Sequence, residues 1–185
     1  RGKDTFVRTQ DAAARGARRT VLLVDHRDSF VHTLGDYLRR QGCRVITHRA
    51  GFPLELLDRI APDLAVLSPG PGTPSELGLS RTIAALLERR IPIFGVCLGL
   101  QGIVEHFGGE LDRLAVPAHG EASTIRIEDT GGGRLFEGIP PTFQAGRYHS
   151  LHARAASMPD CLAVTARSSD GIVMAIEHRS MPVYA

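Results

Sequence analysis

One cysteine of this sequence lies in a setting typical of a catalytic nucleophile. Cys97 is the centre of Gly95-Val96-Cys97-Leu98-Gly99, between an apolar run that predicts a strand and one that predicts a helix. A sharp strand-to-helix turn needs small neighbours, because Cβ atoms would clash there, and it exposes the nucleophile at the end of the strand. A helix N-terminus favours a thiolate, so the sequence predicts a lowered thiol pKa for Cys97.

The other two cysteines, Cys43 and Cys161, lack flanking glycines and are interpreted as small apolar residues of the core. Three well-separated cysteines form neither a disulfide framework nor a cysteine zinc site. We therefore expect no metal site in this chain and a reducing, cytoplasmic setting.

A second loop of unusual composition follows another apolar run. Residues 68–74 read Ser-Pro-Gly-Pro-Gly-Thr-Pro, in which prolines stiffen the backbone and glycines let its N–H groups approach a ligand. Such strings also make ordinary turns, and no Lys-Ser/Thr pair follows to make a phosphate-binding loop. Adjacent parallel strands end at one ligand-binding edge. The loop and Cys97 are therefore expected together, with the loop and Leu98 each donating an N–H to an oxyanion.

Strands and helices alternate in the part of the chain that contains both features. Apolar runs predict buried strands at residues 20–25, 64–68 and 91–96, and a further strand is predicted at 44–49. Helical spacing predicts helices at about 30–41, 53–60, 76–90 and 98–107. The alternation favours an α/β fold, with an open, mostly parallel, flavodoxin-like sheet covered by helices on both faces. Beyond Gly109, shorter alternating segments predict an antiparallel extension, at residues 123–129, 142–150, 162–168 and 171–179.

Length and charge limit the domain organisation and the kinds of partner that we expect. The 185 residues carry 22 basic and 20 acidic side chains, a balance that gives no reason to expect nucleic acid or an anionic membrane as a partner. Residues 1–19 are interpreted as a linker or tail and residues 20–185 as one domain. Since the sequence begins with Arg1, we expect it to be a piece of a longer chain.

Three segments together carry a resemblance to a known family. Residues 95–101 read GVCLGLQ, residues 68–74 read SPGPGTP and residues 25–30 read DHRDSF, and this set resembles the class I glutamine amidotransferases. SPGPGTP combined with GRYHSL at residues 146–151 is similar to the anthranilate and aminodeoxychorismate synthase branch. The resemblance covers about residues 20–185.

The resemblance implies a site and a reaction. Cys97 would attack the carboxamide of L-glutamine, release ammonia and form a thioester that water hydrolyses. Gly70 and Leu98 would supply the oxyanion-hole N–H groups. The residues expected to hold glutamine are Gly70, Pro71, Gly72, Gln101, Ser150 and Leu151.

The sequence departs from the family pattern at three places. The family's catalytic His and Glu follow the last strand, which places them just beyond Ala185, and neither His149 nor His178 matches the base. Glu121 stands where the family usually has Lys in a loop that faces the partner. His26 replaces the Asn of many separate subunits, which is more typical of chains fused to their synthase.

The resemblance therefore implies a glutaminase domain that passes ammonia to a chorismate-using synthase, first of all anthranilate synthase, in the same parent chain. It implies no cofactor in this domain, with Mg²⁺ only in the synthase partner. The alternatives are the amidotransferase of aminodeoxychorismate or aminodeoxyisochorismate synthase, and a module that binds glutamine or a partner without turnover.

Overall fold

The structure is a computed structural model that describes residues 18–128 and 135–185. Most of the predicted linker lies outside these residues. The strands of the described part form one mixed sheet with the order β2-β1-β3-β4-β9-β8-β7-β5-β6. They are β1 (Thr20–Asp25), β2 (Arg44–Arg49), β3 (Leu64–Leu67), β4 (Ile93–Gly95), β5 (Leu111–Ile127), β6 (Thr142–Ala153), β7 (Leu162–Ser168), β8 (Val173–His178) and β9 (Val183–Tyr184).

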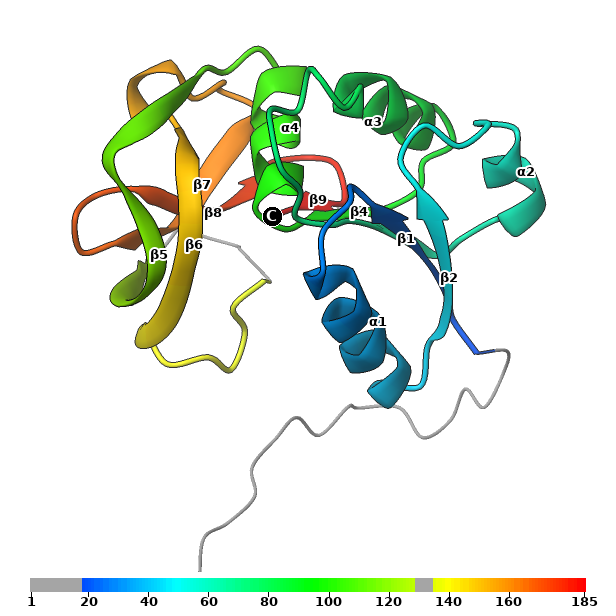
Figure 1. The fold of residues 1–185 in the computed structure, drawn as a ribbon, viewed down its shortest axis with the longest axis horizontal. Coiled ribbons are helices and arrows are strands. Elements are labelled where there is room, and N and C mark those ends of the chain that lie inside the picture. The colour runs from blue at the N-terminus through cyan, green and yellow to red at the C-terminus, as the bar shows by residue number, and fades with distance from the viewer. Residues whose placement is uncertain (1–17, 129–134) are drawn as a thin grey trace, which may run out of the picture.

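Helices cover both faces of the parallel part of this sheet, as predicted (Figure 1). They are α1 (Phe30–Arg40), α2 (Leu56–Ile60), α3 (Leu79–Glu88) and α4 (Leu98–His106), and a 3₁₀ turn spans Ala155–Ser157. Alternate residues of a strand point to opposite faces. In β1, Leu23 packs with Val31 of α1, whereas Leu22 packs in a separate core with Leu57 of α2 and Ile83 of α3.

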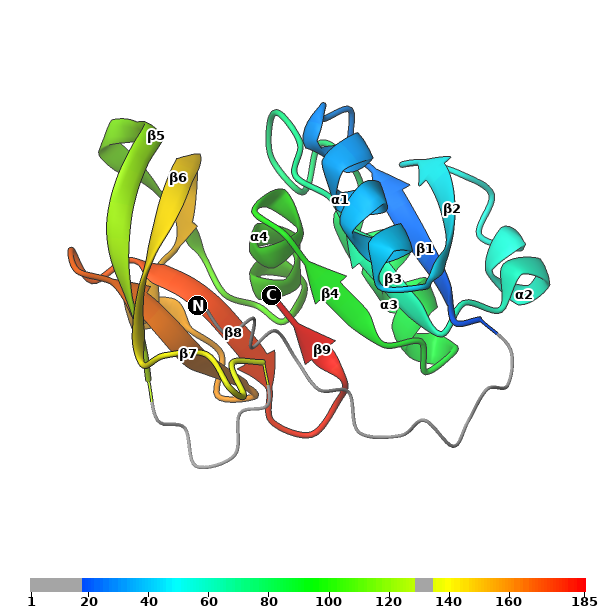
Figure 2. The ribbon, with the colours of Figure 1, turned by 90° about the horizontal axis from the view of Figure 1, so that it is seen from below.

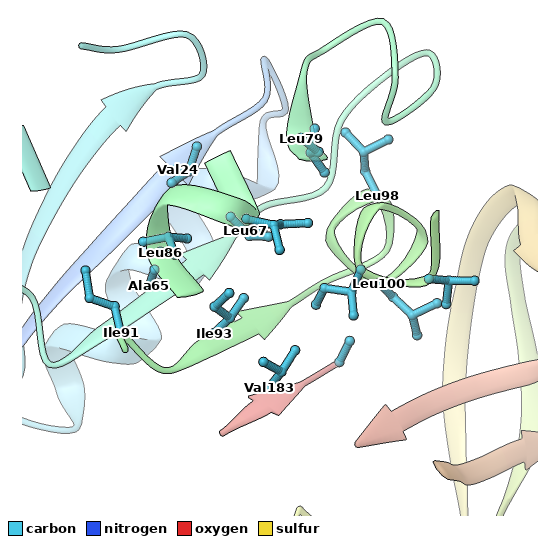
Figure 3. Close-up of a cluster of buried hydrophobic side chains, with 14 of the residues drawn as sticks. Val24, Ala65, Leu67, Leu79, Leu86, Ile91, Ile93, Leu98, Leu100 and Val183 are labelled. Carbon is cyan, nitrogen blue, oxygen red and sulfur yellow. The ribbon is translucent and has the colours of Figure 1, made fainter. Parts of the chain in front are cut away.

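The larger core holds the elements of the candidate site in place. Leu67 of β3, Ile93 of β4 and Leu98 of α4 are each no more than 1% exposed and belong to one cluster (Figure 3). Burial of such side chains stabilises the fold by about 1.5–3 kcal/mol each. The ends of β3 and β4 are therefore fixed against the first turn of α4.

Asp28 caps α1, because the Phe30 N–H donates to Asp28 Oδ1 at 2.7 Å, while the Ser29 side chain makes no capping bond. Two predicted helix starts needed correction. Helix α3 begins at Leu79 and not at Glu76, whose carboxylate instead accepts a hydrogen bond from the Thr73 N–H at 2.8 Å. Helix α2 likewise begins after the predicted residue 53.

The antiparallel extension is larger than predicted and is continuous with the parallel sheet. Strand β5 begins at Leu111, well before the predicted residue 123, and pairs with β6 and β7 (Figure 2). The short strand β9 was not predicted. It lies parallel to β4, with Val183 opposite Ile93, and antiparallel to β8, so it joins the two halves of the sheet. No helix of the described residues is long and apolar enough to span a membrane.

Candidate active site

Cys97 lies on a strained turn between β4 and α4. Its backbone angles, φ 54° and ψ −100°, are rare for any residue with a side chain. A Cβ atom on Gly95 would lie 2.6 Å from the carbonyl carbon of Gly99, and one on Gly99 would lie 2.6 Å from the backbone oxygen of Leu67. The close packing of the strand end on the helix explains both glycines and confirms the predicted elbow.

We expect Gly99→Ala to lower the free energy of unfolding by about 2–3 kcal/mol, because its methyl group would overlap backbone atoms of β3 that cannot move aside. Urea unfolding of both proteins measures the difference. Gly35→Ala in α1 is the matched control, since its methyl group would meet only the mobile end of Arg39, at 3.1 Å. An equal loss in both variants would contradict the packing explanation.

The prediction of a lowered thiol pKa at Cys97 is wrong for the described residues. Burial raises the pKa of the thiol above its ordinary value. The hydrogen bond from the Leu98 N–H opposes this rise, and the nearby Asp28 carboxylate adds to it. The helix N-terminus therefore does act in the predicted direction, but desolvation outweighs it, and a base is needed to take the thiol proton.

The proline-glycine loop lies against the start of α4. A Cβ atom on Gly70 would lie 2.7 Å from Leu98 Cδ2 and 2.7 Å from the backbone oxygen of His26. His26 is fully buried, and its N–H donates to Ser68 Oγ at 2.9 Å. Burial lowers the pKa of His26, so a neutral imidazole packs against the loop, with Nδ1 3.3 Å from Ser68 Oγ. The two residues expected to form an oxyanion hole, Gly70 and Leu98, are thus neighbours.

A pocket of about 330 Å³ opens beside Cys97. Of the predicted site residues, Cys97, Gln101 and Leu151 line it. The oxyanion and loop residues Gly70, Pro71, Gly72 and Leu98, and also Ser150, do not. The full lining is Asp28, Phe30, Pro69, Val96, Cys97, Leu100, Gln101, Gly146, Arg147, Tyr148, His149, Leu151, His152, Val173 and Met174.

Gln101 connects the helix that follows Cys97 with strand β6. Its side chain is buried, and Nε2 donates to the backbone oxygen of Leu151 at 3.0 Å. Its own N–H donates to the backbone oxygen of Cys97 at 3.1 Å, one helical turn back. One pocket is therefore lined by the predicted nucleophile Cys97, by Gln101 and by Leu151 of the segment that was expected to hold glutamine.

Neither histidine considered as a base is placed to act on Cys97. His149 lines the pocket, but its two ring nitrogens are hydrogen-bonded to Arg147 and to the Leu151 oxygen, at 3.2 and 2.9 Å. His178 is outside the pocket, and its Nδ1 accepts hydrogen bonds from the N–H groups of Ser180 and Met181, both at 3.1 Å.

Four polar residues of the pocket or in contact with it were not singled out from the sequence. Asp28, Arg147 and His152 line the pocket, and Asp170 pairs with Arg147. The first three lie within or next to the segments that carry the resemblance, which was the available signal. Asp170 lies in an ordinary Ser-Asp-Gly turn, and nothing in the sequence distinguishes it.

The segment that contains Glu121, where the family usually has Lys, packs against a residue of the pocket. Gly120 has φ +75° at a bulge in β5, and the neighbouring His119 ring packs edge-on against Tyr148, with centroids 5.5 Å apart. Tyr148, which lines the pocket, also contacts the half-exposed Phe30. Among the described residues, no group of three or more His, Cys, Asp or Glu side chains could hold a metal ion.

A strained cysteine at the carboxyl edge of a parallel sheet, with a proline-glycine loop packed on the following helix and a small pocket beside it, is the arrangement expected of an α/β enzyme of covalent acyl transfer. Residues 22–185 match the family Glutamine amidotransferase class-I, and the chain belongs to that family.

Named proteins of similar sequence or structure are consistent with this assignment. Anthranilate synthase of Azospirillum brasilense is 53% identical over 178 residues, which make up 96% of this chain but 24% of that protein. Aminodeoxychorismate/anthranilate synthase component 2 of Bacillus subtilis (strain 168) is 37% identical over 88% of this chain and 83% of that protein. A protein of Thermoplasma acidophilum named for GMP synthase shares the fold, with a TM-score of 0.81 at 23% identity, over 92% of this chain and 83% of that one. The chain thus spans about a quarter of the A. brasilense relative.

Proposed function

We propose that this chain is the glutaminase domain of an anthranilate synthase, which hydrolyses L-glutamine and delivers ammonia to a chorismate-using synthase. The observation that carries the proposal is the strained elbow of Cys97, placed in one pocket wall with Gln101 and Leu151. The relatives named for anthranilate synthase support the choice of synthase.

In the proposed reaction, the Cys97 thiolate attacks the carboxamide carbon of glutamine. The N–H groups of Gly70 and Leu98 are proposed to stabilise the oxyanion, which is supported by the close packing of Gly70 on the Leu98 side chain. Collapse of the intermediate releases ammonia and leaves a glutamyl thioester, which water hydrolyses through a second oxyanion. Pro71, Gly72, Gln101, Ser150 and Leu151 are proposed to hold the rest of the substrate.

A base must complete this site, because burial raises the pKa of the Cys97 thiol. We propose that the base and its Glu partner follow Ala185, as in the family. Strand β9 supports this position. It runs parallel to β4, with Tyr184 opposite Phe94, so residues after it would emerge beside Cys97.

The synthase is proposed to be part of the same parent chain, joined through residues 1–19, in a reducing cytoplasmic compartment. The A. brasilense relative, of which this chain matches only 24%, supports a fused arrangement. Three free cysteines, Cys43, Cys97 and Cys161, are consistent with a reducing setting. The second candidate is the amidotransferase of aminodeoxychorismate synthase, because the B. subtilis relative carries both names.

We expect a glutamine-mimicking diazo-ketone to label Cys97 covalently in the full-length protein, because only this cysteine lies on the elbow beside the pocket. Peptide mass mapping after treatment identifies the labelled residue, and excess glutamine should protect it. Cys43 and Cys161 serve as internal controls. Labelling of either one with Cys97 untouched would refute the assignment, and the absence of any label would favour a module without turnover.

A further inference from the structure

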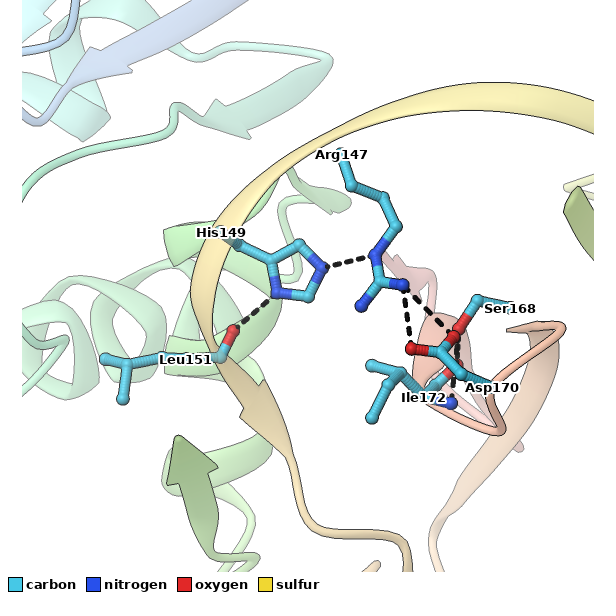
Figure 4. Close-up of polar contacts among 6 residues, drawn as sticks. All are labelled: Arg147, His149, Leu151, Ser168, Asp170 and Ile172. Atoms are coloured by element: carbon cyan, nitrogen blue, oxygen red, sulfur yellow. Dashed lines mark hydrogen bonds and ion pairs between the residues drawn. The ribbon is translucent and has the colours of Figure 1, made fainter. Parts of the chain in front are cut away.

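A chain of polar contacts leads from the β7–β8 turn to the pocket wall (Figure 4). Arg147 of β6, only 6% exposed, donates through Nη1 to both carboxylate oxygens of Asp170, at 3.0 and 2.9 Å. Its Nε donates to Nε2 of His149 at 3.2 Å. The Asp170 side chain is 52% exposed, so a buried guanidinium is balanced by a carboxylate at the protein surface.

These contacts fix the tautomer of His149. A guanidinium can only donate hydrogen bonds, so Nε2 of His149 must accept, and the ring proton lies on Nδ1. Nδ1 then donates to the backbone oxygen of Leu151 at 2.9 Å. Burial lowers the pKa of His149, and this effect outweighs the hydrogen bond to the Leu151 oxygen, which raises the pKa; the positive charge of Arg147 adds to the lowering.

The Leu151 carbonyl receives a second hydrogen bond, from Nε2 of Gln101 at 3.0 Å. Gln101 is held by α4, one turn after Cys97. The Leu151 peptide is therefore held from two directions, by the helix that follows the nucleophile and by the His149 ring. If the His149 ring moved, the Leu151 carbonyl would lose one of these two hydrogen bonds.

We propose that Arg147 and Asp170 are positioning residues for the glutamine substrate, which act through His149 to hold the Leu151 peptide in the pocket that Cys97 also lines. This inference rests on the proposed function. It explains why an arginine is buried here, since a buried charge is retained only where its partners satisfy it. It also explains why the residue is arginine, whose planar group can donate to a carboxylate and to an imidazole at once, whereas lysine is a point charge.

The test compares Arg147→Lys and Asp170→Asn with the wild type in the full-length protein. In both variants we expect the KM for glutamine to rise roughly 5–20-fold, with kcat changed by less than about twofold, because ground-state positioning is lost while the nucleophile stays in place. The rise should be larger for Arg147→Lys, which loses the contact with His149 directly. Glu128→Gln is the matched control, since Glu128 accepts from Arg167 at 2.7 Å on the neighbouring strand, and neither residue lines the pocket.

A second measurement does not depend on turnover. Diethyl pyrocarbonate acylates neutral imidazole nitrogens, so His149 should react slowly in the wild type, where Nε2 is engaged, and several-fold faster in both variants. The exposed His32 provides the internal reference for reagent concentration. Tandem mass spectrometry separates His149 from His152 in the same peptide.

Two results would overturn the proposal. One is an unchanged KM together with unchanged acylation of His149. The other is a parallel fall in kcat, in thermal stability and in alkylation of Cys97 by iodoacetamide, which would make the pair structural only. If the wild type itself neither hydrolyses glutamine nor takes the diazo-ketone label, the proposed function fails, whereas His149 acylation still tests the network.

Discussion

Replacement of Cys97 by serine is expected to abolish glutamine-dependent synthesis by the full-length protein while synthesis from added ammonia continues. A serine hydroxyl on the same elbow is a far weaker nucleophile than a thiolate, so glutaminase turnover should fall by more than about 10³-fold. Added ammonia reaches the synthase without the glutaminase step and should be unaffected. Product formation with glutamine, and separately with an ammonium salt at alkaline pH, measures the two activities.

Cys161→Ser is the matched control for this experiment. It makes the same chemical change at a half-buried cysteine that packs on the main core and does not line the pocket. Both activities should survive in it. Equal loss of both activities in Cys97→Ser would instead show that Cys97 is needed for the fold of this domain or for its contact with the synthase.

The parallel half of the fold was predictable because its signals are local. Residues 20–25 and 44–49 form β1 and β2 as expected, since a continuous apolar or alternating run bounded by polar residues is enough to indicate a strand. Strand β9 could not be found in this way. It has two residues, which carry no periodicity, and it exists because it fits between β4 and β8, its partners in the sheet.

In the candidate site, too, features set by neighbouring residues were predictable, and features set by residues distant in the sequence were not. The elbow around Cys97 was predictable from its flanking glycines, and the closeness of Gly70 to Leu98 followed from the order of parallel strands. The thiol pKa was predicted in the wrong direction, because burial depends on the pocket that distant segments build around the sulfur. The pair of Arg147 and Asp170 was invisible for a similar reason, since it joins two strands that only the folded sheet brings together.

The second large predicted effect is the loss of glutaminase activity in a chain that lacks the general base. The position of β9 next to β4 indicates where that base would enter the site. Strand β4 ends two residues before Cys97, and β9 lies beside it in parallel, so residues that followed Ala185 would emerge at the same edge of the sheet as Cys97. In both views the C-terminus lies beside α4, the helix that starts after Cys97 (Figures 1 and 2). The two histidines considered as substitutes have ring nitrogens engaged elsewhere.

We therefore expect residues 1–185 alone, supplied with the synthase, to release at most traces of glutamate, and a chain extended by the native residues that follow Ala185 to be active. General acid–base catalysis contributes roughly 10²–10⁴-fold, which sets the expected gap between the two chains. Circular dichroism and a cooperative urea transition check that the shorter chain is folded, and alkylation of Cys97 by iodoacetamide at alkaline pH checks that its thiol can react. The alkylation should proceed at alkaline pH and slow as the pH falls, because burial raises the pKa of the thiol and the thiolate is the reactive form.

Replacing the first histidine of the extension by asparagine is the control, and it should return the activity to that of the shorter chain. Full turnover by residues 1–185 would refute the placement of the base and would leave His152, which lines the pocket with Cys97, as the candidate.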